Sequence, residues 1–138
     1  MNDLTNTVAF RRMISPFRQT NSSSAVVSQI IDLQAAKACG IVIQTGALTD
    51  ANATFAALLE EADASDMTGA TTVAAASMSS GIAPATRLAF AFGDDDTFKY
   101  DSYVGTKRYI RLTITPTGND SGNLDVAAFA ILELGKQP

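Results

Sequence analysis

The sequence predicts a single all-β domain, a β-sandwich or jelly-roll-like body, with an extended N-terminal arm. Seven or eight short apolar runs follow one another along the 138 residues, and clusters of Gly, Asn, Asp and Pro separate them. No segment shows the long 3.6-residue periodicity that a stable amphipathic helix needs. A chain of this length can also bury a core within one domain without help from a metal or disulfides.

The first 23 residues differ in composition from the rest of the chain. They are basic, whereas the whole chain has a net charge of −4. Pro16 blocks regular structure, and residues 19–24 (QTNSSS) form a polar hinge. The segment is therefore either a strand laid on the body or an arm that orders on a partner. On this basis we divide the chain into an arm, residues 1–23, and a β-sandwich body, residues 24–138.

The body begins with four expected strands of differing clarity. Residues 24–33 (SAVVSQIIDL) form the first, and residues 40–45 (GIVIQT) are β-branched and nearly continuous, which is typical of a strand covered on both faces. Residues 54–62 (TFAALLEEA) contain helix-favouring residues, but their length and their neighbours favour a strand. Residues 70–78 (ATTVAAASM) are rich in alanine and have the weakest strand pattern.

Two alternating runs follow. Residues 87–92 (RLAFAF) predict a strand with three inward side chains. These are expected to be Leu88, Phe90 and Phe92. After a turn at Gly93 and three aspartates, residues 97–104 (TFKYDSYV) predict a strand with Phe98 and Tyr100 on one face.

The clearest strand is residues 107–115 (KRYIRLTIT). Ile110, Leu112 and Ile114 alternate with polar side chains, so a slip of one residue would expel all three from the core. Burial of each stabilises the fold by about 1.5–3 kcal/mol, and Pro116 is expected to end the strand.

Residues 123–134 (NLDVAAFAILEL) close the chain with apolar side chains on both faces. Phe129 and Ile131 lie opposite the main apolar set. This pattern indicates a central strand, or one whose outer face is covered by another subunit.

The chain offers little for catalysis. It has no histidine, the commonest general base and metal ligand, and its single cysteine, Cys39, stands in an apolar run as a small buried hydrophobe. Glu60 and Glu61 are adjacent in an expected strand, so they point to opposite faces and cannot share a substrate. We therefore expect no enzyme, no catalytic residues and no cofactor.

Metal, nucleic acid and membrane are not expected partners either. Asp94, Asp95 and Asp96 form a solvated hairpin loop without the spacing of a calcium motif, although Asp101 keeps a weak cation site open. The negative net charge argues against nucleic acid. No stretch approaches the ~20 apolar residues of a membrane span, and the N-terminus lacks the apolar core of a signal peptide. We expect synthesis in the cytoplasm.

Three stretches nevertheless resemble a known family. They are AVVSQIIDLQ (25–34), VIQTGALTDANATFAALLEEADASDM (42–67) and YVGTKRYIRLTITPTGNDSG (103–122). Together they resemble the head decoration, or capsid cement, proteins of tailed bacteriophages, over residues 8–134. The pattern YVG-x-KRY-x-RLT-x-TP is the most specific part. The chain departs from the family at residues 35–38, where a glycine–aromatic pair is expected, and in its alanine-rich stretch 70–78.

The resemblance implies a non-enzymatic virion protein, made in the cytoplasm of a bacterial host, that binds the outside of the capsid and stabilises it. Its partner would be the major capsid protein, and it would be a homo-oligomer, with a trimer favoured at sites of local threefold symmetry and a dimer possible. The basic arm suits attachment by strand addition, because it carries both charges and apolar anchors. The expected capsid-binding residues are Phe10, Arg11, Arg12, Ile14, Phe17 and Arg18.

Two further expectations concern this arm and the rival functions. Deletion of residues 1–18 is expected to leave a folded body that no longer binds capsids, unless the apolar residues of the arm cover the body's own sheet. The alternatives to capsid decoration are a phage tail or head-fibre component and a carbohydrate-binding β-sandwich module. A carbohydrate module favours a row of exposed aromatic rings, and this chain has no tryptophan and only three tyrosines. These are Tyr100, Tyr103 and Tyr109.

Overall fold

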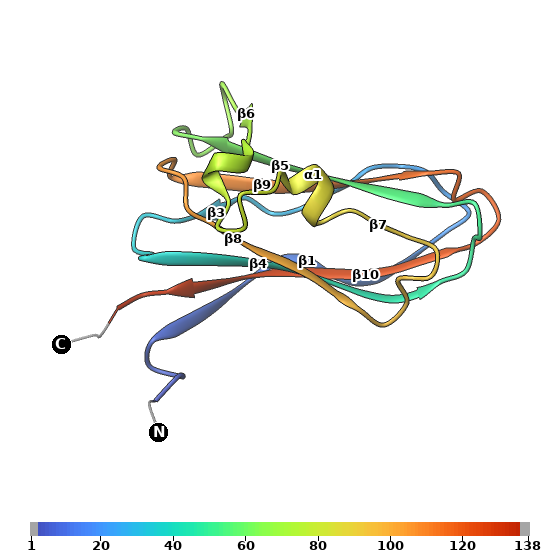
Figure 1. Cartoon of the computed structure of the whole chain (residues 1–138), viewed down its shortest axis with the longest axis horizontal. Coiled ribbons are helices and arrows are strands. Elements are labelled where there is room, and N and C mark those ends of the chain that lie inside the picture. The colour runs from blue at the N-terminus through green and yellow to red at the C-terminus, as the bar shows by residue number, and fades with distance from the viewer. Residues whose placement is uncertain (1–2, 136–138) are drawn as a thin grey trace.

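The structure, a computed structural model, describes residues 3–135 and confirms the all-β sandwich (Figure 1). Two sheets with antiparallel pairing pack face to face. Sheet A has the strand order β1 (Val8–Thr20), β10 (Asn123–Glu133), β4 (Ala38–Leu48), β8 (Phe98–Tyr103). Sheet B has the order β2 (Val26–Val27), β9 (Tyr109–Thr117), β5 (Thr54–Ala62), β6 (Thr71–Thr72), with β3 (Ile31–Asp32) paired to β9 and β7 (Phe90–Ala91) paired to β5.

The core lies between the two sheets and follows the predicted alternation. Ile110, Leu112 and Ile114 of β9 are completely buried, as the sequence predicts. Strand β10 pairs with β1 on one side and β4 on the other, which confirms its central position. Residues 54–62 are also a strand, with their alternate apolar side chains in the core. Cys39 is buried among these residues, as predicted.

Three expected strands are mostly not strands. Of residues 24–33 only Val26–Val27 and Ile31–Asp32 pair, each with β9. Within residues 70–78 only Thr71–Thr72 form a strand, Met78 makes a single bridge to Tyr103, and Ala75–Ser77 form a 3-10 turn, because small alanine side chains give a pleated surface little to pack. Helix α1 (Pro84–Arg87) replaces the start of the expected strand at 87–92. It contacts both β5 and β8 and so closes one flank of the sandwich.

The predictions at two single residues are also wrong. Phe92 is 49% exposed and not inward, since the paired part of its run ends at Ala91. Pro116 does not end β9, which continues to Thr117, and Pro116 pairs with Phe55. The proline is tolerated because β2 pairs with β9 only at Thr113 and Ile114. Among the described residues no strand pairs with Pro116 on that side, so its missing N–H leaves no hydrogen bond unmade there.

The largest correction concerns the arm. Of the two interpretations of this segment, the structure shows the strand laid on the body: β1 pairs with β10 from Val8 opposite Glu133 to Thr20 opposite Asn123. Residues 8–20 therefore belong to the sandwich, and the boundary between an arm at 1–23 and a body at 24–138 is wrong. The predicted arm includes residues 1 and 2 and the predicted body includes residues 136–138, which lie outside the described residues.

Strand β1 accommodates its proline by local irregularity. Its register against β10 shifts between Arg12 and Ile14 and again between Ile14 and Phe17. At the first shift Met13 and Ile14 are consecutive and both buried, which places two β1 side chains in the core instead of one. Bulges and Pro16 are features that protect an edge strand from pairing with another chain. This edge is therefore poorly suited to strand addition.

Candidate protein-binding face

The side chains of sheet A that point away from the core form an apolar surface, which we call the outer face. Phe10, Phe98 and Tyr100 are 62%, 55% and 60% exposed, and others on this surface are half-buried. Exposed aromatic groups that cluster on a rigid element are typical of protein-binding surfaces. The large apolar residues of the outer face are Phe10, Val42, Phe98, Tyr100, Phe129 and Ile131.

Strand register arranges these side chains in rows across the sheet. One row runs Phe10, Ile131, Gly40, Ser102, the next runs Arg12, Phe129, Val42, Tyr100, and a third contains Ala127, Gln44, Phe98. The rings of Phe10 and Phe129 pack against each other with centroids 6.1 Å apart. Contacts between cross-strand neighbours fix these side chains, so the surface is preformed in the absence of a partner.

The outer face of sheet B has a different character. Along β9 it presents polar and charged side chains, and Arg111 forms an ion pair there with Glu60 of β5, N to O 2.9 Å. Leu58 of β5 is 38% exposed beside Thr113. The contrast between the two sheets identifies sheet A as the candidate interaction surface.

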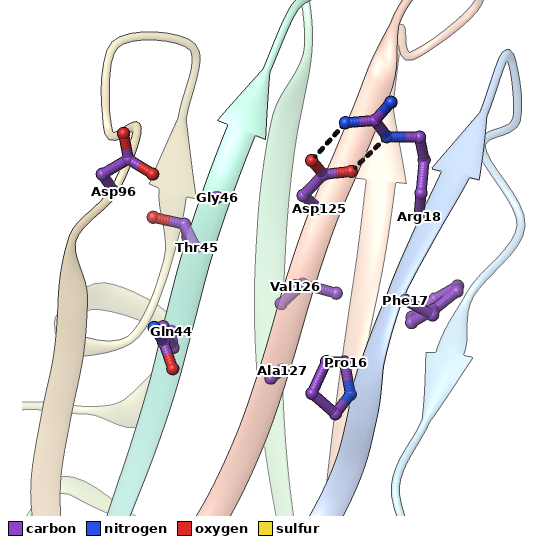
Figure 2. A pocket seen from close by; sticks show the side chains of 10 residues that line it. All are labelled: Pro16, Phe17, Arg18, Gln44, Thr45, Gly46, Asp96, Asp125, Val126 and Ala127. Atoms are coloured by element: carbon purple, nitrogen blue, oxygen red, sulfur yellow. Dashed lines mark hydrogen bonds and ion pairs between the residues drawn. The ribbon is translucent and has the colours of Figure 1, made fainter.

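A shallow groove of about 500 Å³ lies at one end of the outer face (Figure 2). The floor of the groove is formed by two small residues, Ala127 of β10 and Gly46 of β4. Pro16 and Gln44 line its sides. Arg18 and Asp125 close the groove with two parallel hydrogen bonds, each 2.7 Å. The hydrogen bond and charge of Arg18 lower the pKa of Asp125 despite its partial burial.

The structure separates the six residues predicted to bind a capsid. Phe10, Arg12 and Arg18 take the register positions of the outer face, opposite Ile131, Phe129 and Asp125 of β10. Arg11 and Phe17 take the opposite side of the strand but remain exposed, because β1 is an edge strand. Ile14 is 6% exposed and belongs to the core, so its prediction as an anchor is wrong.

A second surface lies along the free edge of β1. The Gln29 backbone N–H donates to the Met13 carbonyl, N to O 2.9 Å, which ties this edge to the segment between β2 and β3. With its amide oriented to accept, the Gln29 side chain lies 3.1 Å from the Arg12 guanidinium. Arg12 therefore reaches over this edge of the sheet, along which Arg11 and Phe17 are also exposed. We call these three residues the β1 edge patch.

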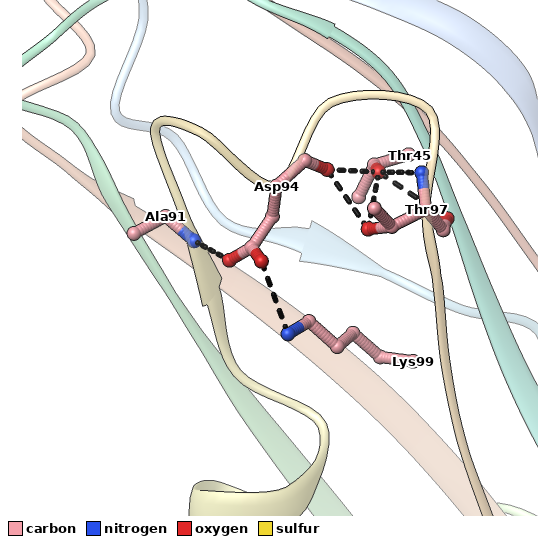
Figure 3. A network of polar contacts seen from close by, with 5 residues as sticks. All are labelled: Thr45, Ala91, Asp94, Thr97 and Lys99. Atoms are coloured by element: carbon pink, nitrogen blue, oxygen red, sulfur yellow. Dashed lines mark hydrogen bonds and ion pairs between the residues drawn. The ribbon is translucent and has the colours of Figure 1, made fainter.

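The aspartates of the loop before β8 act as turn-stabilising groups (Figure 3). Asp94 accepts from the Ala91 N–H and pairs with Lys99, N to O 3.2 Å, while its carbonyl accepts from the Thr45 and Thr97 hydroxyls. Burial alone raises the pKa of Asp94, but these partners outweigh it and the pKa is lowered. Within residues 3–135 no three acidic or cysteine side chains are placed to hold a metal.

The other residues considered for chemistry have structural partners. Glu60 and Glu61 point to opposite faces, as predicted, and Glu61 accepts a hydrogen bond from the buried Tyr103 hydroxyl. Asp101 accepts from the Ser79 hydroxyl, 2.9 Å, and so anchors the turn after β6 to β8. Burial raises the pKa of the Cys39 thiol to about 12, which leaves almost no reactive thiolate at neutral pH.

The YVG-x-KRY-x-RLT segment is explained by the fold. Tyr103 lies beneath its own loop, and its hydroxyl accepts from the Lys107 N–H, N to O 3.1 Å. The basic side chains of the segment each pair with an acid. These pairs are Lys107–Asp63, Arg108–Asp32 and Arg111–Glu60.

Most of the outer face was not among the predicted site residues. Val42, Phe98 and Tyr100 looked like ordinary strand residues, since each occupies one position of a normal alternation. The signal that pointed to the face was the second apolar side of residues 123–134, which contains Phe129 and Ile131.

Within residues 3–135 no helix is long and apolar enough to cross a membrane. In sequence, neither a protein-family model nor a curated protein matches this chain.

Proposed function

We propose that the protein is a non-enzymatic structural component of a tailed-phage particle that binds the outside of the capsid and stabilises it. The observation that carries the proposal is a rigid sandwich with an exposed aromatic face and, beside it, a basic and apolar edge. Such a surface fits another protein better than a small molecule. The resemblance of residues 8–134 to capsid decoration proteins supplies the identity of that other protein, the major capsid protein.

Attachment to the shell is assigned to the β1 edge patch. Arg11 and Arg12 place positive charge on a chain whose net charge is −4, so they orient the protein toward an acidic surface. Phe17, 40% exposed further along the same strand, supplies an apolar contact. Modest affinity per copy is sufficient, because a shell repeats the site many times.

We expect the double substitution Arg11→Glu, Arg12→Glu to weaken binding to undecorated capsids roughly tenfold or more at low salt. Both side chains are exposed, so the fold is expected to persist. Binding is measured by co-sedimentation with capsids over a series of salt concentrations.

The matched control is Lys37→Glu, Arg87→Glu, which changes the net charge equally at exposed positions away from β1. The control is expected to bind like the parent chain. If both variants lose the same capsid affinity, the loss comes from net charge and not from the position of Arg11 and Arg12. Unchanged binding of the β1 variant would also contradict the assignment of this edge.

A further inference from the structure

We propose that the outer face of sheet A is a twofold interface between two copies of this chain. Capsid binding is assigned to the β1 edge patch, which shares Arg12 with the outer face, so the oligomeric state is tested at Val42 and Ile131, outside that patch. It commits to a dimer, whereas the resemblance favours a trimer. Three properties of the face support a second copy as its occupant: its shape, its charges and its area.

The shape is self-complementary about an axis that runs along the strands, between β10 and β4. Rotation about this axis places β10 of one copy over β4 of the other. Each outward β10 residue then lies over the same β4 residue that it pairs with inside its own sheet. Ile131 then lies over Gly40, and Gln44 lies over Ala127. Phe129 lies over Val42 at the centre. Away from the apolar centre, Ile131 and Gln44 thus each meet a small residue, and Gln44 enters the groove above Ala127.

The charges select this axis. It brings Arg18, on β1, over Asp96 of the other copy, because the Asp96 N–H bonds to the Gly46 carbonyl at the same end of the sheet. Asp125 then faces Gly46, which carries no charge. An axis across the strands at Phe129 would instead set Asp125 against Glu133 of the other copy, since these residues lie at equal distances on either side of Phe129 on the outer side of β10. Opposed like charges at an interface are unfavourable.

The area is sufficient for a small dimer. The five outward positions of β10 from Asp125 to Glu133 span a length of about 27 Å, and four strands give a width of about 19 Å. Two such faces bury about 1,000 Å², which is near the lower limit for a specific interface. The dimer is therefore expected to dissociate on dilution.

The oligomeric state tests the occupant. Sedimentation equilibrium over a wide concentration range is expected to show a monomer–dimer equilibrium for the parent chain. Val42→Glu and Ile131→Glu place a charge in the centre of the face and are expected to raise the dissociation constant at least tenfold. Thr113→Glu, on the outer face of sheet B, is the matched control and is expected to leave it unchanged.

Circular dichroism and thermal melting of the variants separate loss of the dimer from loss of the fold. Because the substituted side chains point outward, folded monomers are expected. A parent chain that stays monomeric at high concentration overturns the proposal, as does a trimer or a dimer that survives both substitutions.

Thiol crosslinking tests the axis. The buried Cys39 does not compete, so single Arg12→Cys and Tyr100→Cys variants carry one reactive thiol each. Along-strand symmetry places residue 12 of one copy over residue 100 of the other, at opposite edges of the sheet. A short bis-maleimide is then expected to link a mixture of the two variants, with one mass-labelled, and to link neither variant to itself. Efficient self-linking of each variant would contradict this axis.

Discussion

A chain that lacks residues 1–18 is expected to lose its cooperative fold. The deletion removes nearly all of β1 and so strips one side of β10, which lies in the centre of sheet A. It also removes Met13 and Ile14, which are 2% and 6% exposed in the core. Loss of such side chains costs about 2–5 kcal/mol each, and the whole fold is stable by only about 5–15 kcal/mol.

The measurement is urea denaturation followed by circular dichroism. The truncated chain is expected to show no unfolding transition, or to aggregate through the exposed edge of β10. A chain that lacks only residues 1–6 keeps β1 and is expected to stay within about 1 kcal/mol of the parent. Cooperative unfolding of the shorter chain at the parent's midpoint would show that β1 is dispensable. The result also decides how attachment can be studied, because truncation cannot separate binding from folding when β1 supplies core side chains and pairs with β10.

Substitution of Gly105 by alanine is expected to destabilise the protein by about 2–4 kcal/mol. A Cβ atom at this position would lie 2.6 Å from Cε2 of the Tyr103 ring. Tyr103 is 4% exposed and cannot swing into solvent without leaving the core. Any shift of the ring also disturbs its hydrogen bonds with Glu61 and the Lys107 N–H.

The neighbouring substitution Thr106→Ala is the matched control, since Thr106 is exposed in the same loop. It is expected to change the free energy of unfolding by no more than about 0.5 kcal/mol. The comparison is made from urea midpoints at constant slope. If Gly105→Ala is as stable as the control, the glycine is present for a reason other than the packing of Tyr103.

The sequence predicts the parts of this fold in which side-chain alternation is strong. Ile110, Leu112 and Ile114 alternate with polar residues in β9, and the structure buries all three. The two apolar sides of residues 123–134 correctly indicate a central strand. In β9 the local pattern and the tertiary environment agree, because one side of the strand packs in the core and the other side carries polar residues away from it.

The same reasoning fails where long-range pairing decides the outcome. A proline and a polar hinge made residues 1–23 look detachable, but bulges in β1 allow Pro16 to remain in an edge strand paired with β10. Residues 70–78 lack side chains that would specify a strand, and their conformation is set by contacts such as Asp101 with Ser79.

The candidate site was predicted in part only. Phe10, Arg11, Arg12, Phe17 and Arg18 are exposed, as an interface requires, but Ile14 is not. Alternation predicts which side chains share a face of one strand, yet it does not say which strands are neighbours. The outer face joins residues from β1, β4, β8 and β10, so it becomes visible only once the sheet order is known.

The most direct test of the central proposal is the location and copy number of this protein in purified particles. Cryo-electron microscopy with quantitative mass spectrometry gives both. A capsid decoration protein is expected on the outer surface of the head, in hundreds of copies per particle. A few to tens of copies at the tail or on a head fibre, or absence from the particle, would contradict it.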